Sequence, residues 1–207
     1  IGNWSDCSHW SDGIIPVDGQ DVVIASGIVT QNVTSATAGF VTLAAGATNM
    51  VTGANTILRA TNIVIGGVIT HPPQGDTVAP WDPDHRVYVV CTNLMITPSG
   101  AIVVDGKGYL GGLTQSPQSS GCGPGGGPYA GSSASPGAGY GGAGGTGRDG
   151  PGGVTYGSPY APVDPGSGGG SGYNGWGGAG GGAIRIVAAG AVTNDGLISA
   201  NGDNSTS

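Results

Sequence analysis

Glutamate is missing from the chain altogether, and lysine occurs only once. Charged residues make up 8% of the 207 residues, and leucine and methionine are scarce. An ordinary soluble domain has about 25% charged residues, and the residues that are scarce here are the strong helix formers. The composition therefore nearly excludes helix and leaves strand, turn and glycine-rich coil.

Basic surfaces and long apolar runs are also lacking. The formal net charge is −7, whereas nucleic-acid binding requires a lysine and arginine patch that neutralises phosphates. No run approaches the ~20 apolar residues of a membrane-spanning helix. We therefore predict neither a nucleic-acid partner nor a membrane span. The chain starts at Ile1 without a basic and apolar leader, and we expect a removed secretion signal and a longer parent protein.

Cysteine is rare, and its count is odd. The disulfide candidates are Cys7, Cys91 and Cys122. They permit at most one intramolecular disulfide and leave one thiol over.

Three Asn-x-Ser/Thr sequons predict N-glycosylation. The acceptors are Asn3, Asn32 and Asn204. Sequons also arise by chance in a chain rich in Asn, Ser and Thr. With the cysteines they favour a secreted, extracellular glycoprotein at a cell surface.

Residues 1–20 are predicted to form an N-terminal tryptophan cap. Trp4 and Trp10 lie six residues apart, and a Gly-x-x-Pro turn and an Asp-Gly turn follow before the run Val22–Ile24. Indole rings here would cover the end of a core that otherwise presents an adhesive sheet edge.

The same segment carries a resemblance. From Trp4 to Gly27 it reads Trp-Ser…Trp…Gly…Pro…Gly-x-Asp-Val-Val-Ile…Gly. This string resembles the start of large secreted β-helix surface proteins, including bacterial autotransporter-like passengers. It is also similar to the glycine-named ectodomain module of some animal cell-surface proteins. The resemblance implies a secreted β-helix and little about activity.

Short β-branched runs between turns fill residues 21–106. They are Val22–Ile24, Ile28–Thr30, Phe40–Leu43, Ile57–Leu58, Ile63–Ile65, Val68–Thr70, Val87–Val90, Leu94–Thr97 and Ala101–Val104. Runs of this kind suit all-β stacking. A parallel solenoid is favoured over a sandwich, because each turn of chain adds one short strand to each face. We therefore predict an all-β parallel β-helix with its rungs in 21–106.

Glycine dominates the next region, with 28 glycines in the 62 residues from 121 to 182 and no Gly-x-y period. Residues 107–182 are predicted to be one long insertion. Polyproline II-like strands packed through bare glycine faces, a polyglycine bundle, would order it; Ω-like loops are the alternative. Aromatic residues in this tract serve either as buried anchors or as glycan-stacking surfaces. The stacking candidates are Tyr140, Tyr156, Tyr160, Tyr173 and Trp176.

Residues 183–207 are predicted to return to the solenoid. Leu94–Gly106 and Ile184–Gly202 both read strand, small-residue turn, strand and turn, which indicates two neighbouring rungs. The ending from 176 to 203 resembles a recurring signature of giant secreted repeat proteins. That resemblance implies architecture only.

Catalytic patterns are not evident. The densest acidic cluster lies in the Pro-rich loop 71–86, where Asp-Pro turns explain the aspartates. Its weak metal candidates are Asp82, Asp84 and His85, and no zinc spacing or nucleophile elbow occurs. Gly144–Asp149 matches the opening of a calcium-binding repeat, but Pro151 takes the apolar position. We predict no catalytic residues and no cofactor, with calcium as an alternative.

The function predicted from these features is a self-assembling, non-catalytic subunit of a surface fibre or filament. An uncapped solenoid end would template the next copy, and head-to-tail addition gives an open filament. One alternative is a carbohydrate-binding adhesin or receptor-binding tip that recognises cell-surface glycans. A less favoured alternative is a polysaccharide-active β-helix enzyme with converging aspartates.

Overall fold

The computed structural model describes residues 2–113, 119–131, 134–173 and 175–205. The chain folds into two compact units. One, which we call the strand unit, comprises Ile1–Pro72, His85–Val103 and Ile184–Ser199. The other, which we call the glycine unit, comprises Pro73–Asp84, Val104–Ala183 and Ala200–Ser207.

Within the described residues, regular secondary structure belongs to the strand unit and is almost entirely strand. Its elements are β1 (Gly2–Asn3), η1 (a 3-10 turn, Cys7–His9), β2 (Val22–Ile24), β3 (Gly27–Gln31), β4 (Ala38–Leu43), β5 (Ala47–Val51), β6 (Leu58–Ile65), β7 (Val68–Thr70), β8 (Val87–Ile96), β9 (Ala101–Val103), β10 (Ile184–Ala188), β11 (Val192–Asn194) and β12 (Leu197–Ser199).

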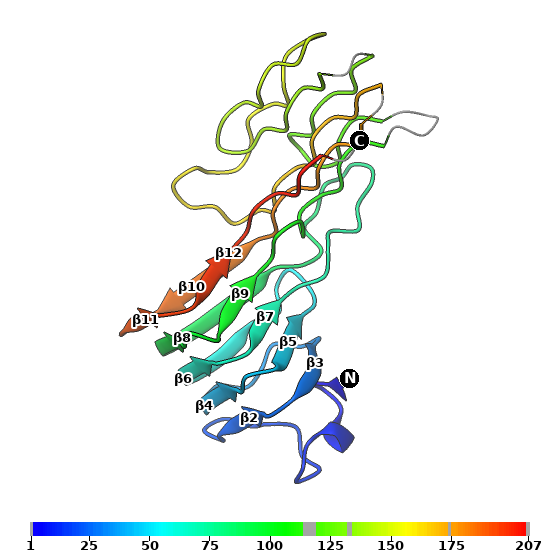
Figure 1. Cartoon of the computed structure of the whole chain (residues 1–207). Coiled ribbons are helices and arrows are strands. Elements are labelled where there is room, and N and C mark those ends of the chain that lie inside the picture. Colours follow the sequence, from blue (N-terminus) through cyan, green and yellow to red (C-terminus); the bar gives the residue numbers. More distant parts are fainter. Residues whose placement is uncertain (1, 114–118, 132–133, 174, 206–207) are drawn as a thin grey trace. The chain divides into compact units, whose positions relative to one another are not determined.

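These strands form two parallel sheets (Figure 1). One has the order β1-β3-β5-β7-β9-β12, and the other has the order β10-β8-β6-β4-β2 with β11 also paired to β8. From β2 to β10, strands that follow one another along the chain lie in alternate sheets. Both sheets therefore run from the N-terminal strands at one end to β10, β11 and β12 at the other.

This topology corrects the predicted fold class. The prediction was a parallel β-helix, or solenoid, with one glycine-rich insertion and a polyglycine bundle; the structure has two parallel sheets of six strands each in the strand unit, and the glycine unit is a separate compact unit. The glycine unit also takes in Pro73–Asp84 and Ala200–Ser207. The physical reason is that short β-branched runs encode strands, whereas the sheets they join depend on pairing between distant segments.

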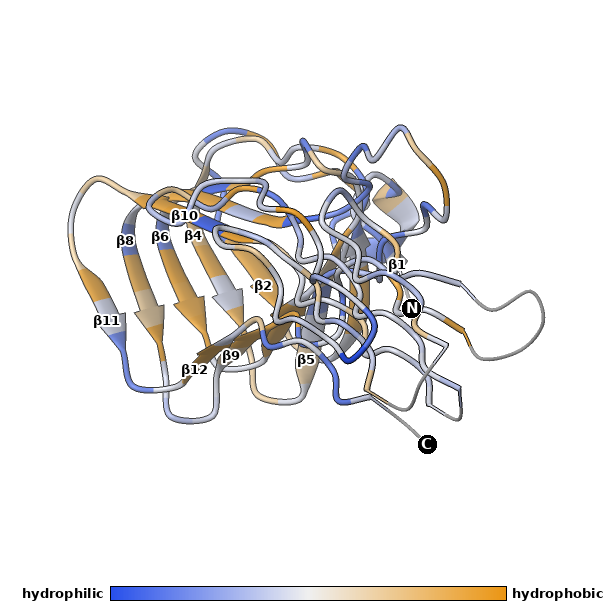
Figure 2. Ribbon diagram, turned by 90° about the horizontal axis from the view of Figure 1, so that it is seen from above, coloured by the Kyte–Doolittle hydropathy of each residue, from blue (hydrophilic) through white to orange (hydrophobic). Residues whose placement is uncertain are grey.

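The register of the pairing builds the core in columns. Val22, Val41, Ile63, Leu94 and Val192 occupy equivalent positions on β2, β4, β6, β8 and β11. The first four are at most 3% exposed. Burying each such side chain contributes about 1.5–3 kcal/mol, so a one-residue slip would expose a whole column and is strongly disfavoured. Figure 2 shows apolar residues along these strands.

Strand β5 was not predicted, because its inward side includes a polar residue. Asn49 is 1% exposed and its Nδ2 donates to Oε1 of Gln31 at 3.0 Å. Gln31 is also buried, and its Nε2 donates to the carbonyl of Ile57 at 3.0 Å. These bonds engage Nδ2 of Asn49 and the side-chain amide of Gln31, whereas Oδ1 of Asn49 is buried without a hydrogen-bond partner. The polar pair interrupts the apolar alternation that identifies a strand in a sequence.

Backbone hydrogen bonds hold three extended segments of the glycine unit together. Tyr109 and Gly112 donate to Gly166 and Gly169; Gly166 and Gly169 donate to Gly181 and Gly178; and Gly180 and Gly177 donate back to Tyr109 and Gly112. All six N···O distances are 2.8–2.9 Å. The bonds recur at three-residue intervals, as expected for an extended chain with three residues per turn.

Glycine is required where these segments approach one another. Gly168 is buried, and a Cβ on it would overlap the carbonyl oxygen of Leu110. Gly142 is exposed, and a Cβ there would meet no atom within 4 Å. Close packing therefore requires glycine at position 168, whereas nothing around position 142 requires it.

We expect Gly168→Ala to destabilise the glycine unit by about 3 kcal/mol, because inserting a methyl group forces packed backbones apart. Gly142→Ala should change stability by less than about 1 kcal/mol, or raise it slightly by restricting the unfolded chain. Differential scanning calorimetry of both variants checks this. Equal melting profiles for the two would contradict the close packing described here.

Candidate functional site

The predicted acidic cluster is divided between the two units. Asp82 and Asp84 belong to the glycine unit, whereas His85 belongs to the strand unit. The carboxylate of Asp84 accepts from the N–H of Gly75 at 2.7 Å, and Nδ1 of His85 accepts from the N–H of Gly53 at 3.0 Å. Each side chain therefore holds a backbone segment of its own unit, 9 residues away for Asp84 and 32 residues away for His85.

Metal ligands do not gather elsewhere in the described part of the chain. No group of three or more His, Cys or Asp side chains is placed to hold an ion within residues 2–113, 119–131, 134–173 and 175–205. In the calcium-like segment, Gly147 and Gly150 form an antiparallel bridge across a turn that contains Asp149. The segment thus closes a tight turn.

The three cysteines are free thiols in the structure. Cys7 is exposed, Cys91 is buried in β8 and Cys122 is half-buried. Burial raises the pKa of both the Cys91 and the Cys122 thiol above the ordinary value, which lowers the reactivity of both. A disulfide among the three stays a prediction.

All three glycosylation candidates are exposed: Asn3 in β1, Asn32 after β3, and Asn204 in the glycine unit. Nδ2 of Asn32 donates to Oγ of Ser5 at 3.0 Å. Exposure is a condition for glycan attachment, and occupancy stays a prediction.

Two of the five aromatic candidates pack against each other. The rings of Tyr140 and Tyr156 meet edge to face with centroids 4.9 Å apart. The Tyr140 hydroxyl accepts from the N–H of Asp164, and the Tyr156 hydroxyl donates to the carbonyl of Pro165. Burial raises the pKa of Tyr156 to about 12. These two residues therefore act as anchors of the glycine unit.

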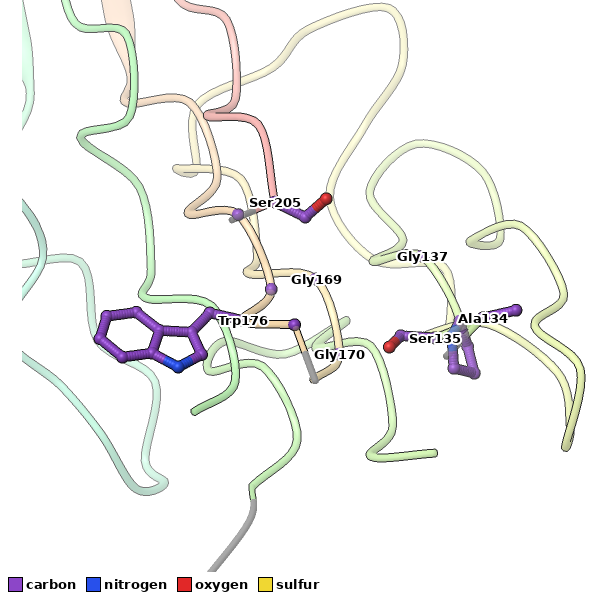
Figure 3. A pocket seen from close by; sticks show the side chains of 11 residues that line it. Ala134, Ser135, Gly137, Gly169, Gly170, Trp176 and Ser205 are labelled. Atoms are coloured by element: carbon purple, nitrogen blue, oxygen red, sulfur yellow. The ribbon is translucent and has the colours of Figure 1, made fainter. Parts of the chain in front are cut away.

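The other three aromatic candidates are open to solvent. Tyr160 is 97% exposed, Tyr173 65% and Trp176 44%. Trp176 borders a hollow of about 380 Å³ that is otherwise lined mainly by glycines 137, 169, 170, 175, 177 and 178. Figure 3 shows the indole pointing away from Ser135 on the opposite wall. Because most of its lining residues are glycines, the hollow presents mostly backbone, and Tyr160 and Tyr173 are not among the residues that line it.

A second exposed surface lies in the strand unit, where β10, β11 and β12 end the two sheets (Figure 1). We call these strands the open layer. Val192 is 52% exposed, although Leu94, its neighbour in the same column, is 2% exposed. Ile198 is 40% exposed beside Ile102 at 0%. The open layer therefore leaves apolar core positions uncovered.

The opposite end of the strand unit is covered. Val22 begins the column that ends at Val192 and is only 3% exposed. Trp4 is 1% exposed, and Trp10 packs on it edge to face with centroids 5.2 Å apart. Nε1 of Trp10 donates to the carbonyl of Trp4 at 2.9 Å. The two ends thus differ: a tryptophan pair closes one, and the other is open.

Sequence reasoning anticipated an uncapped end without naming its residues. The exposed apolar members of the open layer are Val187, Val192, Leu197 and Ile198, and Leu197 is 52% exposed. The signal in the sequence for this end was the pattern that residues 94–106 and 184–202 share. It predicted neighbouring strands, and β11 and β12 do pair with β8 and β9.

Comparison with protein-family models, with curated proteins and with solved structures finds no match. The 3-10 turn is the only helix in the described residues, and none there is long and apolar enough to cross a membrane.

We expect alkaline pH to destabilise the glycine unit through Tyr156. The pKa of this group is near 10 in an unfolded chain and about 12 in the folded one. Its contribution is therefore complete below pH 10 and is lost as the pH rises toward 12, since the unfolded chain releases the proton first.

Urea denaturation at pH 9 and pH 11 measures this loss. Tyr156→Phe should reduce the fall in stability between the two pH values, whereas Tyr160→Phe, at a fully exposed ring, should leave it unchanged. An identical fall in both variants would show that Tyr156 is not responsible.

Proposed function

We propose that the chain is a non-catalytic structural subunit of an extracellular surface fibre and that it assembles with copies of itself. The observation that carries the proposal is the difference between the two ends of the strand unit. Val192 and Ile198 lie uncovered at one end, while Val22 and Trp4 are buried at the other. Contacts between two different ends are head-to-tail, and they give an open filament where the rotation between copies does not close into a ring.

Electrostatics and exposed edges support assembly further. Charged residues form only 8% of the chain, so little charge repulsion opposes the close approach of copies. The outer edges of β10 and β12 end their sheets, and an uncovered sheet edge is a template for pairing with another chain. The exposed Asn3, Asn32 and Asn204 support an extracellular setting, where sequons receive glycans.

We expect the purified chain to form filaments whose length increases with protein concentration. Negative-stain electron microscopy and light scattering measure this, and intact mass under non-reducing conditions reports hexose addition and disulfides. Discrete particles of the 19.9 kDa polypeptide at every concentration would overturn the fibre proposal.

A carbohydrate-binding adhesin is the second candidate, and the open rings of Tyr160, Tyr173 and Trp176 favour it. Aromatic faces stack on sugar rings through their apolar surface. Unlike the rings of the Tyr140–Tyr156 pair, the rings of Tyr160 and Tyr173 are more than half exposed.

If this candidate is right, Trp176→Ala should abolish retardation in affinity gels that contain soluble neutral glucans or galactans. Val154→Ala removes an exposed apolar side chain from the same unit, at 66% exposure, and serves as the matched control. Unretarded migration of the unchanged chain in every gel would exclude a neutral-polysaccharide ligand of this class.

A further inference from the structure

We propose that the open layer of one copy docks on the N-terminal end of the strand unit of a second copy. This inference rests on the proposed function and specifies the contact between neighbouring copies, which we call the joint. The open layer supplies Val192, Leu197 and Ile198. The second copy supplies the surface around Trp10, Ile14 and Val23.

The N-terminal end carries a hollow with a mixed lining. Its volume is about 200 Å³; Trp10, Ile14, Pro16 and Val23 supply apolar side chains, and Ser11, Asp12, Gln20 and Asp21 supply polar ones. Ile14 is 56% exposed and Val23 is 61% exposed. The N-terminal end therefore buries the core beneath it and still exposes the apolar side chains of Ile14 and Val23 beside the polar part of the hollow, and the open layer would cover these two side chains.

Strand direction favours a head-to-tail joint. All pairings within the two sheets are parallel. The free edges are β10 and β12 at one end and β2 and β1 at the other. A second copy in the same orientation brings β2 toward β10 and β1 toward β12, so each sheet meets its own counterpart with its direction preserved.

Charge disfavours the cap-to-cap arrangement. Residues 1–30 contain four aspartates and no Lys or Arg, a formal charge of −4. Residues 184–199 contain Arg185 and Asp195, a formal charge of zero. Two N-terminal ends brought together would oppose like charges, whereas an open layer against an N-terminal end does not.

One polar residue limits how the joint forms. Asn194 stands at the inward position that Ile96 occupies in the previous strand, and its Oδ1 accepts from the N–H of Gly196 at 3.2 Å. The side chain is thus engaged in its own turn. The apolar contact is concentrated at Val192 and Ile198, and these two positions are the ones to change.

The test uses two variants, each with one damaged end. Val192→Lys/Ile198→Lys places charges in the open layer, and Val23→Lys places a charge in the hollow. Each alone should remain monomeric, with the melting temperature of the unchanged chain. Mixed at equal concentrations, they should form a discrete 1:1 dimer in size-exclusion chromatography with light scattering, because each retains one intact end.

Thr193→Lys is the matched control. Thr193 lies on β11 between the two inward positions and points outward, like its partner Met95, which is 45% exposed. This variant should assemble like the unchanged chain.

The outcomes separate the joint from the proposed function. An unchanged chain that stays monomeric overturns the fibre proposal and the joint together. An unchanged chain that forms filaments while Val192→Lys/Ile198→Lys does so equally overturns only the joint. A discrete dimer of the unchanged chain overturns head-to-tail docking, because a symmetric contact closes after two copies.

Discussion

Parallel pairing in constant register is the constraint on which the strand unit depends. Strands from different parts of the chain align residue by residue, so that inward positions fall into columns, as in the series from Val22 to Val192. Each layer shields the apolar residues of the layer before it. Among the described residues no further strand pairs with the last layer, and its Val192 and Ile198 are exposed.

The two units pack their interiors and satisfy their backbone hydrogen bonds in different ways. In the strand unit, apolar side chains are buried between sheets, and the backbone groups are satisfied by ladder hydrogen bonds. In the glycine unit, absent side chains allow backbones to touch, and hydrogen bonds between segments at three-residue intervals replace much of the side-chain core. Aromatic anchors such as Tyr109, at 1% exposure, and the Tyr140–Tyr156 pair complete it. The low content of charged residues is compatible with both kinds of packing.

Sequence reasoning succeeded where local chemistry decides and failed where distant segments meet. Val22–Ile24 and Val68–Thr70 were predicted as strands and are strands, since β-branched residues favour extended backbone. Strand β5 was missed because Asn49 faces inward and bonds to Gln31 from another strand. The predicted fold class was wrong because sheet membership is a property of pairs, and neither member of a pair encodes it alone.

The candidate sites, like the fold, depend partly on composition and partly on contacts between distant segments. The amino-acid composition by itself determined that helix is nearly absent, that glycine and aromatics would need an unusual unit, and that strands dominate the remainder. Only the tertiary structure decided that Tyr156 is an anchor while Tyr160 is open, and that Asp84 and His85 fall in different units. It also decided that Val192 is exposed while Leu94 is buried in the same column. Composition and propensity act on each residue locally, whereas exposure depends on which distant segment lies against it.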